Sequence, residues 1–386
     1  MKKQLTRIAS WMLLATMGQV GVFAQNIRID MNQTYPEKTI SLQKVADVKY
    51  IPLETTDEVL FNGIVTNLSA EGIAGFNKKE GDILVFDGTG KAIASFNHTG
   101  QGPNEYNKIY HLDVDWKQKE VYVQDNFRQK IRIYGLDGRH LRTIDLQETM
   151  QQGDLYSFSD THLIYYAQPK SKPVTPYEPV TLLSKKDASK VTLPFTKTDD
   201  NLVKATGGPF GDMKMSAKNV NLLCKKGDEV YVNEVTADVI YRVESNHALT
   251  PVVERTPSYQ DASGQDFFLM LTGANARYYF FKRQQALLEF QGNAATDTKS
   301  TYVAYDRKEK QLLNPTFTNE DYPSQDIPMS KLLQCAGSAN RCYLQLEAFK
   351  LKEALAEGKL KGTLKSIAEK LDEEDNPVLM VVEFKK

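Results

Sequence analysis

The stretch ILVFDGTGKAIASFNHTGQGPNEY, residues 83–106, decides the fold. It reads as an apolar strand, a turn with two glycines, a second alternating strand and a glycine-containing loop. A second sequence, IRIYGLDGRHLRTI at residues 131–144, aligns with residues 83–96 without a gap. Apolar positions coincide with apolar positions, and Gly138 coincides with Gly90. These two segments are therefore two copies of one β-hairpin.

The repeated hairpin predicts an all-β architecture built from similar units. A tight hairpin needs a residue with positive φ, and glycine adopts it at the least cost, so the shared glycine has a mechanical reason. Repeats of this length indicate a propeller or an open array of β units. Further strands predicted at residues 64–76, 111–116 and 121–124 complete two units of four strands.

Strands in the middle of the chain follow a weaker pattern. The third unit is expected at residues 163–167, 180–184 and 191–195, the fourth at 220–224, 229–233, 239–243 and 249–253, and the fifth at 278–282, 286–290, 302–306 and 311–313. The repeat is degenerate here, so the boundaries between units stay open from residue 155 to residue 313.

Both ends of the chain are expected to form the last unit. Residues 27–31 and 48–53 read as strands, and VLMVVEF at residues 378–384 is too apolar for a free tail. Pairing these strands closes a ring and leaves few sheet edges exposed. Counting this mixed unit predicts a six-bladed β-propeller of four-stranded antiparallel blades. We expect a single domain over residues 25–386, with a short helical insertion at about residues 343–372, where the apolar spacing is helical.

The first residues have the three parts of a secretory signal. Lys2, Lys3 and Arg7 form a basic region, an apolar run follows, and Ala24 precedes the expected cleavage site. The apolar run is shorter than the roughly 20 residues that a membrane-spanning helix needs. We therefore expect residues 1–24 to be removed. The mature chain is then periplasmic or secreted from a Gram-negative cell, without a membrane span.

The composition is that of an ordinary globular protein, with 41% hydrophobic residues, 25% charged residues and a formal net charge of −1. Loss of the signal removes three basic residues and no acidic one, which leaves the mature chain mildly acidic. An acidic chain is a poor ligand for the phosphate backbone. We expect no nucleic-acid partner.

Four segments carry a family resemblance: VKYIPLETTDE at residues 48–58, GQGPNEY at residues 100–106, VYVQDNFRQKIRIYGLDGRHL at residues 121–141 and DNPVLMVVEF at residues 375–384. Together they resemble the six-bladed β-propeller proteins of bacterial envelopes, a largely uncharacterised family with NHL-like or TolB-like propeller architecture. The resemblance implies a propeller fold, an exported location and a binding role. It supplies no catalytic residues.

Motifs for catalysis or cofactor binding are absent from the sequence. The five histidines are scattered, and there is no HExxH, GxSxG, P-loop or GxGxxG. His111, Asp113 and Asp115 alternate along one predicted strand and so share a face, which is the nearest approach to a metal site. The same alternation is typical of any half-buried strand. We predict no catalytic residue, no metal site and no cofactor.

The chain has three cysteines, an odd number for an oxidising compartment. Cys335 and Cys342 could close a short loop as a disulfide, because the exported context favours one. Cys224 ends an apolar strand and reads as a buried thiol. The sequence leaves open whether Cys335 and Cys342 are bonded.

The loop at residues 100–106 is the candidate ligand-binding site. Such a loop joins the outer strand of one blade to the inner strand of the next, close to the channel mouth. Gln101, Asn104, Glu105 and Tyr106 offer amide, carboxylate and phenol groups for hydrogen bonding and stacking. In the alternative interpretation the glycines and proline fix a turn, and Glu105 and Tyr106 hold neighbouring blades together.

Two classes of function remain open. One is a binding or interaction module for an envelope glycan, peptide or protein, which the absence of catalytic spacing favours. The other is a propeller hydrolase or lyase acting on a saccharide or lactone, which needs polar side chains that converge on the central channel. An acidic cluster or a histidine at the channel mouth would favour the enzyme. A channel filled with aromatic and aliphatic side chains would favour binding.

Overall fold

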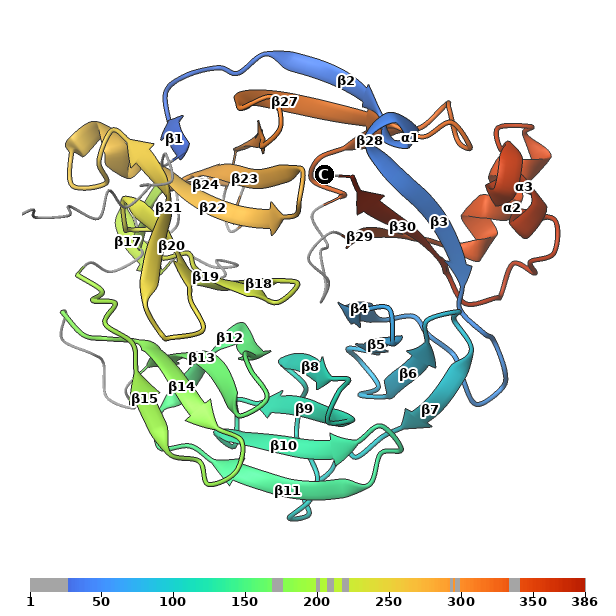
Figure 1. Cartoon of the computed structure of the whole chain (residues 1–386), viewed down its shortest axis with the longest axis horizontal. Helices are drawn as coiled ribbons and strands as arrows, with labels where there is room; N and C mark the ends of the chain where they lie inside the picture. Colours follow the sequence, from blue (N-terminus) through green and yellow to red (C-terminus); the bar gives the residue numbers. More distant parts are fainter. Residues whose placement is uncertain are drawn as a thin grey trace, which may run out of the picture.

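The computed structural model of the chain is a six-bladed β-propeller, with the sheets arranged in a ring (Figure 1). The predicted fold class and blade number are thus confirmed. The predicted signal peptide lies outside the described residues. The structure describes residues 27–168, 176–198, 202–206, 212–216, 222–291, 294–295, 299–332 and 341–385.

The first two blades are each formed by four consecutive strands, as the repeated hairpin predicted. Blade 1 consists of β4 (Ile64–Leu68), β5 (Gly72–Phe76), β6 (Ile83–Asp87) and β7 (Ala92–Phe96). Blade 2 consists of β8 (His111–Asp115), β9 (Glu120–Asp125), β10 (Lys130–Gly135) and β11 (His140–Asp145).

The shared glycine of the two hairpins occupies equivalent turns. Gly90 has φ of 92° and Gly138 has φ of 82°, so both lie in the left-handed region that favours glycine. A Cβ atom on Gly138 would also lie 2.6 Å from Cγ of Phe96 in the outer strand of blade 1. Glycine at this position therefore serves both the hairpin turn and the packing of blade 2 against blade 1.

The next three blades follow in chain order. Blade 3 consists of β12 (Thr149–Ser157), β13 (His162–Gln168), β14 (Val180–Ser184) and β15 (Lys190–Thr192). Blade 4 contains β18 (Leu223–Lys226), β19 (Glu229–Val232), β20 (Val239–Val243) and β21 (Leu249–Thr256). Blade 5 contains β22 (Phe267–Ala274), β23 (Tyr278–Gln285), β26 (Ser300–Asp306) and β27 (Gln311–Thr318), and the short β28 (Asp326–Pro328) pairs with β27.

The two ends of the chain meet in blade 6. This blade has three described strands, β29 (Arg341–Leu346), β30 (Val378–Phe384) and β3 (Ala46–Pro52), and β30 pairs antiparallel with both others. The prediction that residues 48–53 pair with the last strand is therefore confirmed. Two helices, α2 (Ala348–Ala356) and α3 (Gly362–Ala368), stand between β29 and β30.

The rest of the N-terminal segment lies against two other blades. Strand β1 (Ile27–Asp30) pairs parallel with β21 of blade 4, and β2 (Glu37–Ser41) pairs parallel with β27 of blade 5. A short helix, α1 (Leu42–Val45), leads into β3. We call residues 27–52 the N-terminal strap, because they follow the outside of three consecutive blades (Figure 1).

Some predicted elements were wrong. Residues 27–31 do not pair with residues 378–384, because the intervening β2 occupies blade 5 and places β1 one blade further round the ring. Residues 286–290 do not belong to blade 5. They form most of β24 (Leu287–Gln291), which pairs with β16 in a separate sheet. The helical insertion begins at Ala348, since residues 343–346 continue strand β29.

The separate sheet consists of β17 (Met213–Ser216), β16 (Leu202–Thr206), β24 and β25 (Ala294–Ala295). Its strands come from the connection between blades 3 and 4 and from the insertion within blade 5.

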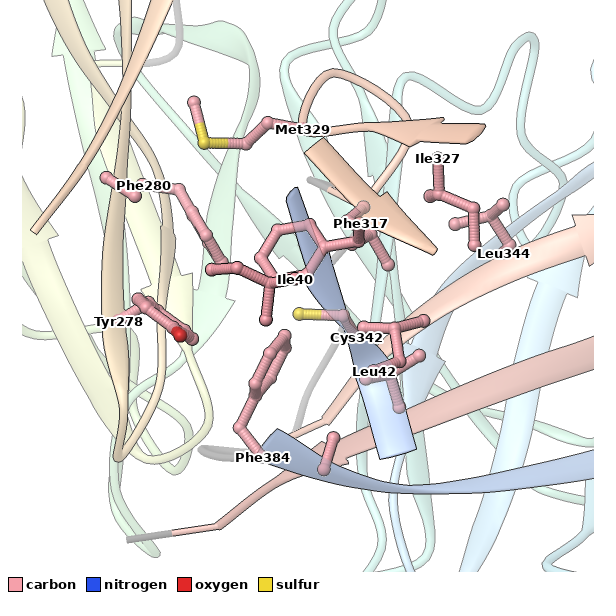
Figure 2. Close-up of a cluster of buried hydrophobic side chains, with 14 of the residues drawn as sticks. Ile40, Leu42, Tyr278, Phe280, Phe317, Ile327, Met329, Cys342, Leu344 and Phe384 are labelled. Carbon is pink, nitrogen blue, oxygen red and sulfur yellow. The ribbon is translucent and has the colours of Figure 1, made fainter. Parts of the chain in front are cut away.

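Closure of the ring rests on a cluster of buried side chains from the strap and from blades 5 and 6 (Figure 2). The centre of the Phe384 ring in β30 lies 5.4 Å from the centre of the Tyr278 ring and 6.0 Å from that of the Phe317 ring, both in blade 5. Ile40 and Leu42 from the strap are buried in the same cluster. Burial of this apolar surface joins the last blade to its neighbour through three segments that are far apart in sequence.

Candidate functional site

The strand connections emerge on two opposite faces of the ring, because neighbouring strands in a blade are antiparallel. One face, which we call the loop face, carries residues 77–82, 97–110 and 126–129. The α2–α3 insertion lies on the same face, since Asn376 donates to the carbonyls of Glu54 and Val59 in the connection from blade 6 to blade 1. The opposite face, the turn face, carries short turns at residues 88–91, 136–139, 185–189 and 307–310.

Hydrogen bonds link the inner strands of blades 1 to 4 through one carboxylate. Asp113 accepts from Asn67 Nδ2 at 2.8 Å and from the backbone N of Ser157 at 2.6 Å. Lys225 Nζ lies 3.0 Å from the same carboxylate. Asp113 is only 3% exposed, so this carboxylate is buried with donors from three other blades. The arrangement fixes neighbouring blades relative to one another.

A second carboxylate of the same strand has its own lysine. Lys185 Nζ lies 2.6 Å from Asp115 Oδ2, and it donates to Ser157 Oγ at 2.8 Å and to the carbonyl of Ser159 at 2.7 Å. Burial would raise the pKa of Asp115, but the hydrogen bond and charge of Lys185 lower this pKa below its usual range. Burial lowers the pKa of Lys185 despite Asp115.

His111 stands apart from these two pairs. Its ring lies 5.0 Å from that of Tyr156 in an edge-on contact, and its Nε2 is buried without a hydrogen-bond partner among the described residues. Burial lowers the pKa of His111 to about 4, so the imidazole is neutral near pH 7. His111, Asp113 and Asp115 thus have different partners. Within the described ranges, no group of three or more His, Cys, Asp or Glu residues is placed to hold a metal ion.

The candidate loop at residues 100–106 is clamped by blade 2. Arg128 donates to the carbonyls of Gly100, Gly102 and Glu105 at 3.1, 3.1 and 3.2 Å. Its Nη2 also donates to Gln101 Oε1 at 2.7 Å. The hydroxyl of Tyr134 donates to the carbonyl of Asn104 at 2.7 Å. One guanidinium and one phenol therefore hold most of the loop backbone in a single conformation.

The four predicted site residues differ in exposure. Gln101 and Asn104 are exposed, whereas Tyr106 is fully buried. The Tyr106 hydroxyl donates to the carbonyl of Gly81 at 2.7 Å and accepts from the backbone N of His98 at 3.0 Å, and burial raises the pKa of Tyr106 to about 12. Glu105 accepts from the backbone N of Gly102 at 2.6 Å. Gln101 and Asn104 therefore face solvent, with Gln101 also bonded to Arg128, whereas the Glu105 and Tyr106 side chains bind the loop and its neighbours.

Two of the three cysteines, Cys224 and Cys342, lie within the described residues. Cys342 is buried in β29, and Cys335 lies outside the described residues, so their disulfide stays a prediction. Cys224 is buried in β18, and its Sγ lies 3.3 Å from the carbonyl oxygen of Leu271 in blade 5.

Two of the cavities among the described residues lie beside the loops that join blade 1 to its neighbouring blades. One, of about 510 Å³, lies between α2, β29 and the start of β4, and its lining includes Tyr322, Lys331, Gln345 and Lys350. The other, of about 380 Å³, lies between the β5–β6 turn and the loop that joins blades 1 and 2, on the loop face. It is lined by Lys78, Lys79, Glu80, Gly81, Thr99, Asn107, Lys108 and Ile109. Sequence reasoning missed the second cavity, although the adjacent Lys78 and Lys79, between the segment predicted at residues 64–76 and the hairpin that starts at residue 83, were a usable signal.

The comparison with known sequence families decides the family. A domain of unknown function, DUF4934, matches residues 26–383. The chain belongs to this family. Comparison with curated proteins finds no significant match.

Solved structures support the propeller architecture of this DUF4934 member. A candidate exported protein from Bacteroides fragilis superposes with a TM-score of 0.62 at 15% identity, covering 93% of this chain and 99% of that one. A DUF4221 family member from Bacteroides vulgatus gives a TM-score of 0.51 at 9% identity, covering 89% of this chain and 98% of that one. Identities this low support the fold alone. None of the described helices is long and apolar enough to span a bilayer.

Proposed function

We propose that this DUF4934 protein is an exported binding or interaction module that recognises a glycan, peptide or protein of the bacterial envelope through its loop face. The proposal includes removal of residues 1–24 and a single propeller domain over residues 25–386. Gln101 and Asn104 would then contact ligand directly, while Glu105 and Tyr106 would hold their loop in place.

One observation carries the proposal: the inner-strand carboxylates already have protein partners. Asp113 and Asp115 each lie within 3.0 Å of a lysine ammonium and accept further hydrogen bonds. A general acid or base needs a carboxyl group that can reach the proton it transfers. Two lysine-paired carboxylates are better suited to joining blades than to transferring protons. The cavity of about 380 Å³, in contrast, is lined mainly by exposed side chains of the loops.

The test is binding without conversion of the ligand. Purified mature protein is titrated with a panel of envelope polysaccharides, peptidoglycan fragments and peptides, and each ligand is recovered and analysed by mass spectrometry. We expect at least one to bind and to return unchanged. Failure of every class to bind would overturn the proposal, and intact-mass measurement of exported protein that kept Met1 would overturn the processing step.

A hydrolase or lyase is the second candidate, and His111 is the observation that favours it. Its imidazole is neutral near pH 7, its Nε2 has no partner among the described residues, and Asp113 is close enough to influence its pKa. A neutral imidazole can accept a proton, although the burial of this Nε2 and the low pKa make His111 a weak base. The enzyme predicts a shortened or eliminated saccharide or an opened lactone in the same assay, and His111→Ala would abolish that product. Binding with no product would dismiss this candidate.

A further inference from the structure

We infer that the 380 Å³ cavity between blades 1 and 2, together with the neighbouring aromatic pair Tyr110 and Phe127, binds an anionic saccharide. The sugar would carry uronate carboxylates or sulfates. This inference rests on the proposed binding function and names the ligand class and the place on the loop face.

Charge is the first support for an anionic ligand. Lys78, Lys79 and Lys108 line the cavity together with a single carboxylate, Glu80. The three lysines are exposed, and none of their ammonium groups forms an ion pair or hydrogen bond with a described residue. Most of the exposed charge at the cavity is therefore positive and unneutralised. In a chain with a net charge of −1 this is a local excess of positive charge.

The aromatic pair is the second support. Phe127 is 67% exposed, which makes it the most exposed large hydrophobic side chain among the described residues. Its ring lies 5.6 Å from that of Tyr110, and Lys108 Nζ lies 5.7 Å from the centre of the Tyr110 ring. Lys108 thus lines the cavity and lies next to the aromatic pair, so the two features are adjacent. A stacking platform next to cations suits a ring with an apolar face and an acidic substituent.

The polar groups of the cavity suit a sugar better than an acidic peptide. Thr99 and Asn107 add a hydroxyl and an amide to the lining, and both types can donate to and accept from sugar hydroxyls. Peptides commonly bind by adding a strand to a sheet edge. This cavity lies at the ends of strands, among turns and loops, and does not follow a strand edge.

The walls of the cavity are held in place by the protein before any ligand arrives. The carbonyl of Gly81 accepts from the Tyr106 hydroxyl, and the carbonyl of Glu80 accepts from Asn97 Nδ2 at 2.9 Å. On the other side, Asn107 N donates to Asp125 of blade 2 at 3.0 Å. A preformed site loses less conformational entropy on binding. Tyr106 is in this sense a positioning residue beneath the cavity.

The experiment compares charged and neutral forms of the same chain. Oligogalacturonate and its methyl ester share the sugar backbone and differ in charge, and dextran sulfate with dextran forms the corresponding sulfate pair. Titration of the full mature protein by calorimetry should detect an acid or sulfate form and not its neutral partner. Binding should weaken as salt concentration rises.

Variants then locate the site. The triple variant K78A/K79A/K108A should lower affinity by about tenfold or more, and Phe127→Ala by severalfold. The matched control K91A/K186A/K308A removes the same charge from exposed positions on the turn face, and we expect it to bind within about twofold of the parent. Thermal unfolding of every variant checks that the fold is kept.

Each other outcome counts against the inference. Equal binding of the methyl ester would overturn the anionic class, and equal loss in both triple variants would overturn the site. Poly-glutamate that binds as tightly through the same three lysines would overturn the saccharide. If neutral glycans or peptides bind but no anionic sugar does, this inference fails while the proposed function stands. If no ligand of any class binds, both fail.

Discussion

Blades 1 and 2 are each formed by four consecutive strands, whereas blades 4, 5 and 6 each include a strand from the N-terminal strap. The first two blades could be read from one hairpin and its copy. Blades 4, 5 and 6 also contain pairings between residues more than two hundred positions apart, such as Ile27 with Val253 and Glu37 with Asn314. Contacts within a blade are local, but closure of the ring is not, and only the local contacts leave a repeat in the sequence.

The N-terminal strap takes part in ring closure at three blades, in two different ways. In blade 6 it supplies a full antiparallel strand, while in blades 4 and 5 it adds a parallel strand to the outer edge. Covering an outer strand satisfies backbone groups that would otherwise present a sheet edge. Closure is thus distributed over three blades. Disturbing it should affect the molecule more than an equal disturbance in blades 1 and 2, and the predictions below test that difference.

The largest effect is expected from removal of the last strand. A chain that ends at Pro377 lacks β30, which is the central strand of blade 6 and pairs with both β29 and β3. We expect no cooperative thermal transition, because two ladders and the cluster around Phe384 are lost together. A control that ends at Phe384 keeps both ladders and should unfold like the parent. An unchanged melting temperature for the chain ending at Pro377 would contradict closure through β30.

A point substitution at the same junction should have the next largest effect. Phe384→Ala removes a ring that is 3% exposed and contacts aromatic rings of blade 5, so we expect a loss of about 3–5 kcal/mol in the free energy of unfolding. Phe349→Ala on α2 makes the same chemical change at a side chain that is 45% exposed and should cost much less. Urea unfolding measures both. Equal losses of unfolding free energy in the two variants would show that the junction between blades 5 and 6 contributes no more to stability than an exposed helix position.

The difference between the regions also explains which parts of the fold could be predicted. The alternating strands of blades 1 and 2, the turn glycines and the apolar residues 378–384 are local signals, and each led to the right element. The inner strands β12 and β22 were missed, and residues 286–290 were assigned to the wrong sheet. An apolar segment of five residues predicts a strand but does not say which sheet it joins.

The site was less predictable than the fold for a related reason. The glycine loop at residues 100–106 was visible in the sequence, but its contacts with Arg128 and Tyr134 depend on how blade 2 packs on blade 1. The pairing of Asp113 with Lys225 joins residues in blades 2 and 4. No spacing in the sequence encodes such a pair. DUF4934 is a domain of unknown function, so the proposals above rest on contacts of this kind.

A smaller effect is expected from the inner strand of blade 2, and it depends on pH. The pKa of His111 is lowered by burial to about 4 in the folded protein, from 6.5, so the unfolded chain takes up a proton first as pH falls. His111 therefore does not reduce the free energy of unfolding above pH 6.5. Between pH 6.5 and pH 4 it reduces this free energy by up to roughly 3 kcal/mol. The variant His111→Phe keeps an aromatic ring and should lack this loss.

Comparing the parent protein with the variant His111→Phe separates the effect of His111 from that of other titratable groups. Burial raises the pKa of Asp154 well above its usual value, which stabilises the folded state as pH falls, but this contribution is present in both proteins. Asp115 has a lowered pKa and matters only at still lower pH. Urea midpoints measured at pH 7, 5.5 and 4.5 give the slope of stability against pH for the parent and for the variant. Parallel slopes would show that His111 is not buried as a neutral group.

The smallest effect is expected at the joint between blades 1 and 2, where Tyr106→Phe removes one hydroxyl from a fully buried side chain. That hydroxyl donates to the carbonyl of Gly81 and accepts from the backbone N of His98, so both groups lose a partner in the variant. We expect a loss of about 1–2 kcal/mol in the free energy of unfolding, with the denaturant slope unchanged. Tyr110→Phe is the matched control, because no described residue hydrogen-bonds to the Tyr110 hydroxyl, and it should change stability little. If Tyr106 instead contacted ligand directly, Tyr106→Phe would weaken ligand binding while the urea midpoint stayed at the parental value. A residue that positions the loop should instead give a lower urea midpoint and only an indirect effect on ligand binding. The loss of stability should be smaller than the loss at Phe384, because Arg128, Tyr134 and the packing of Gly138 on Phe96 also hold the joint between blades 1 and 2.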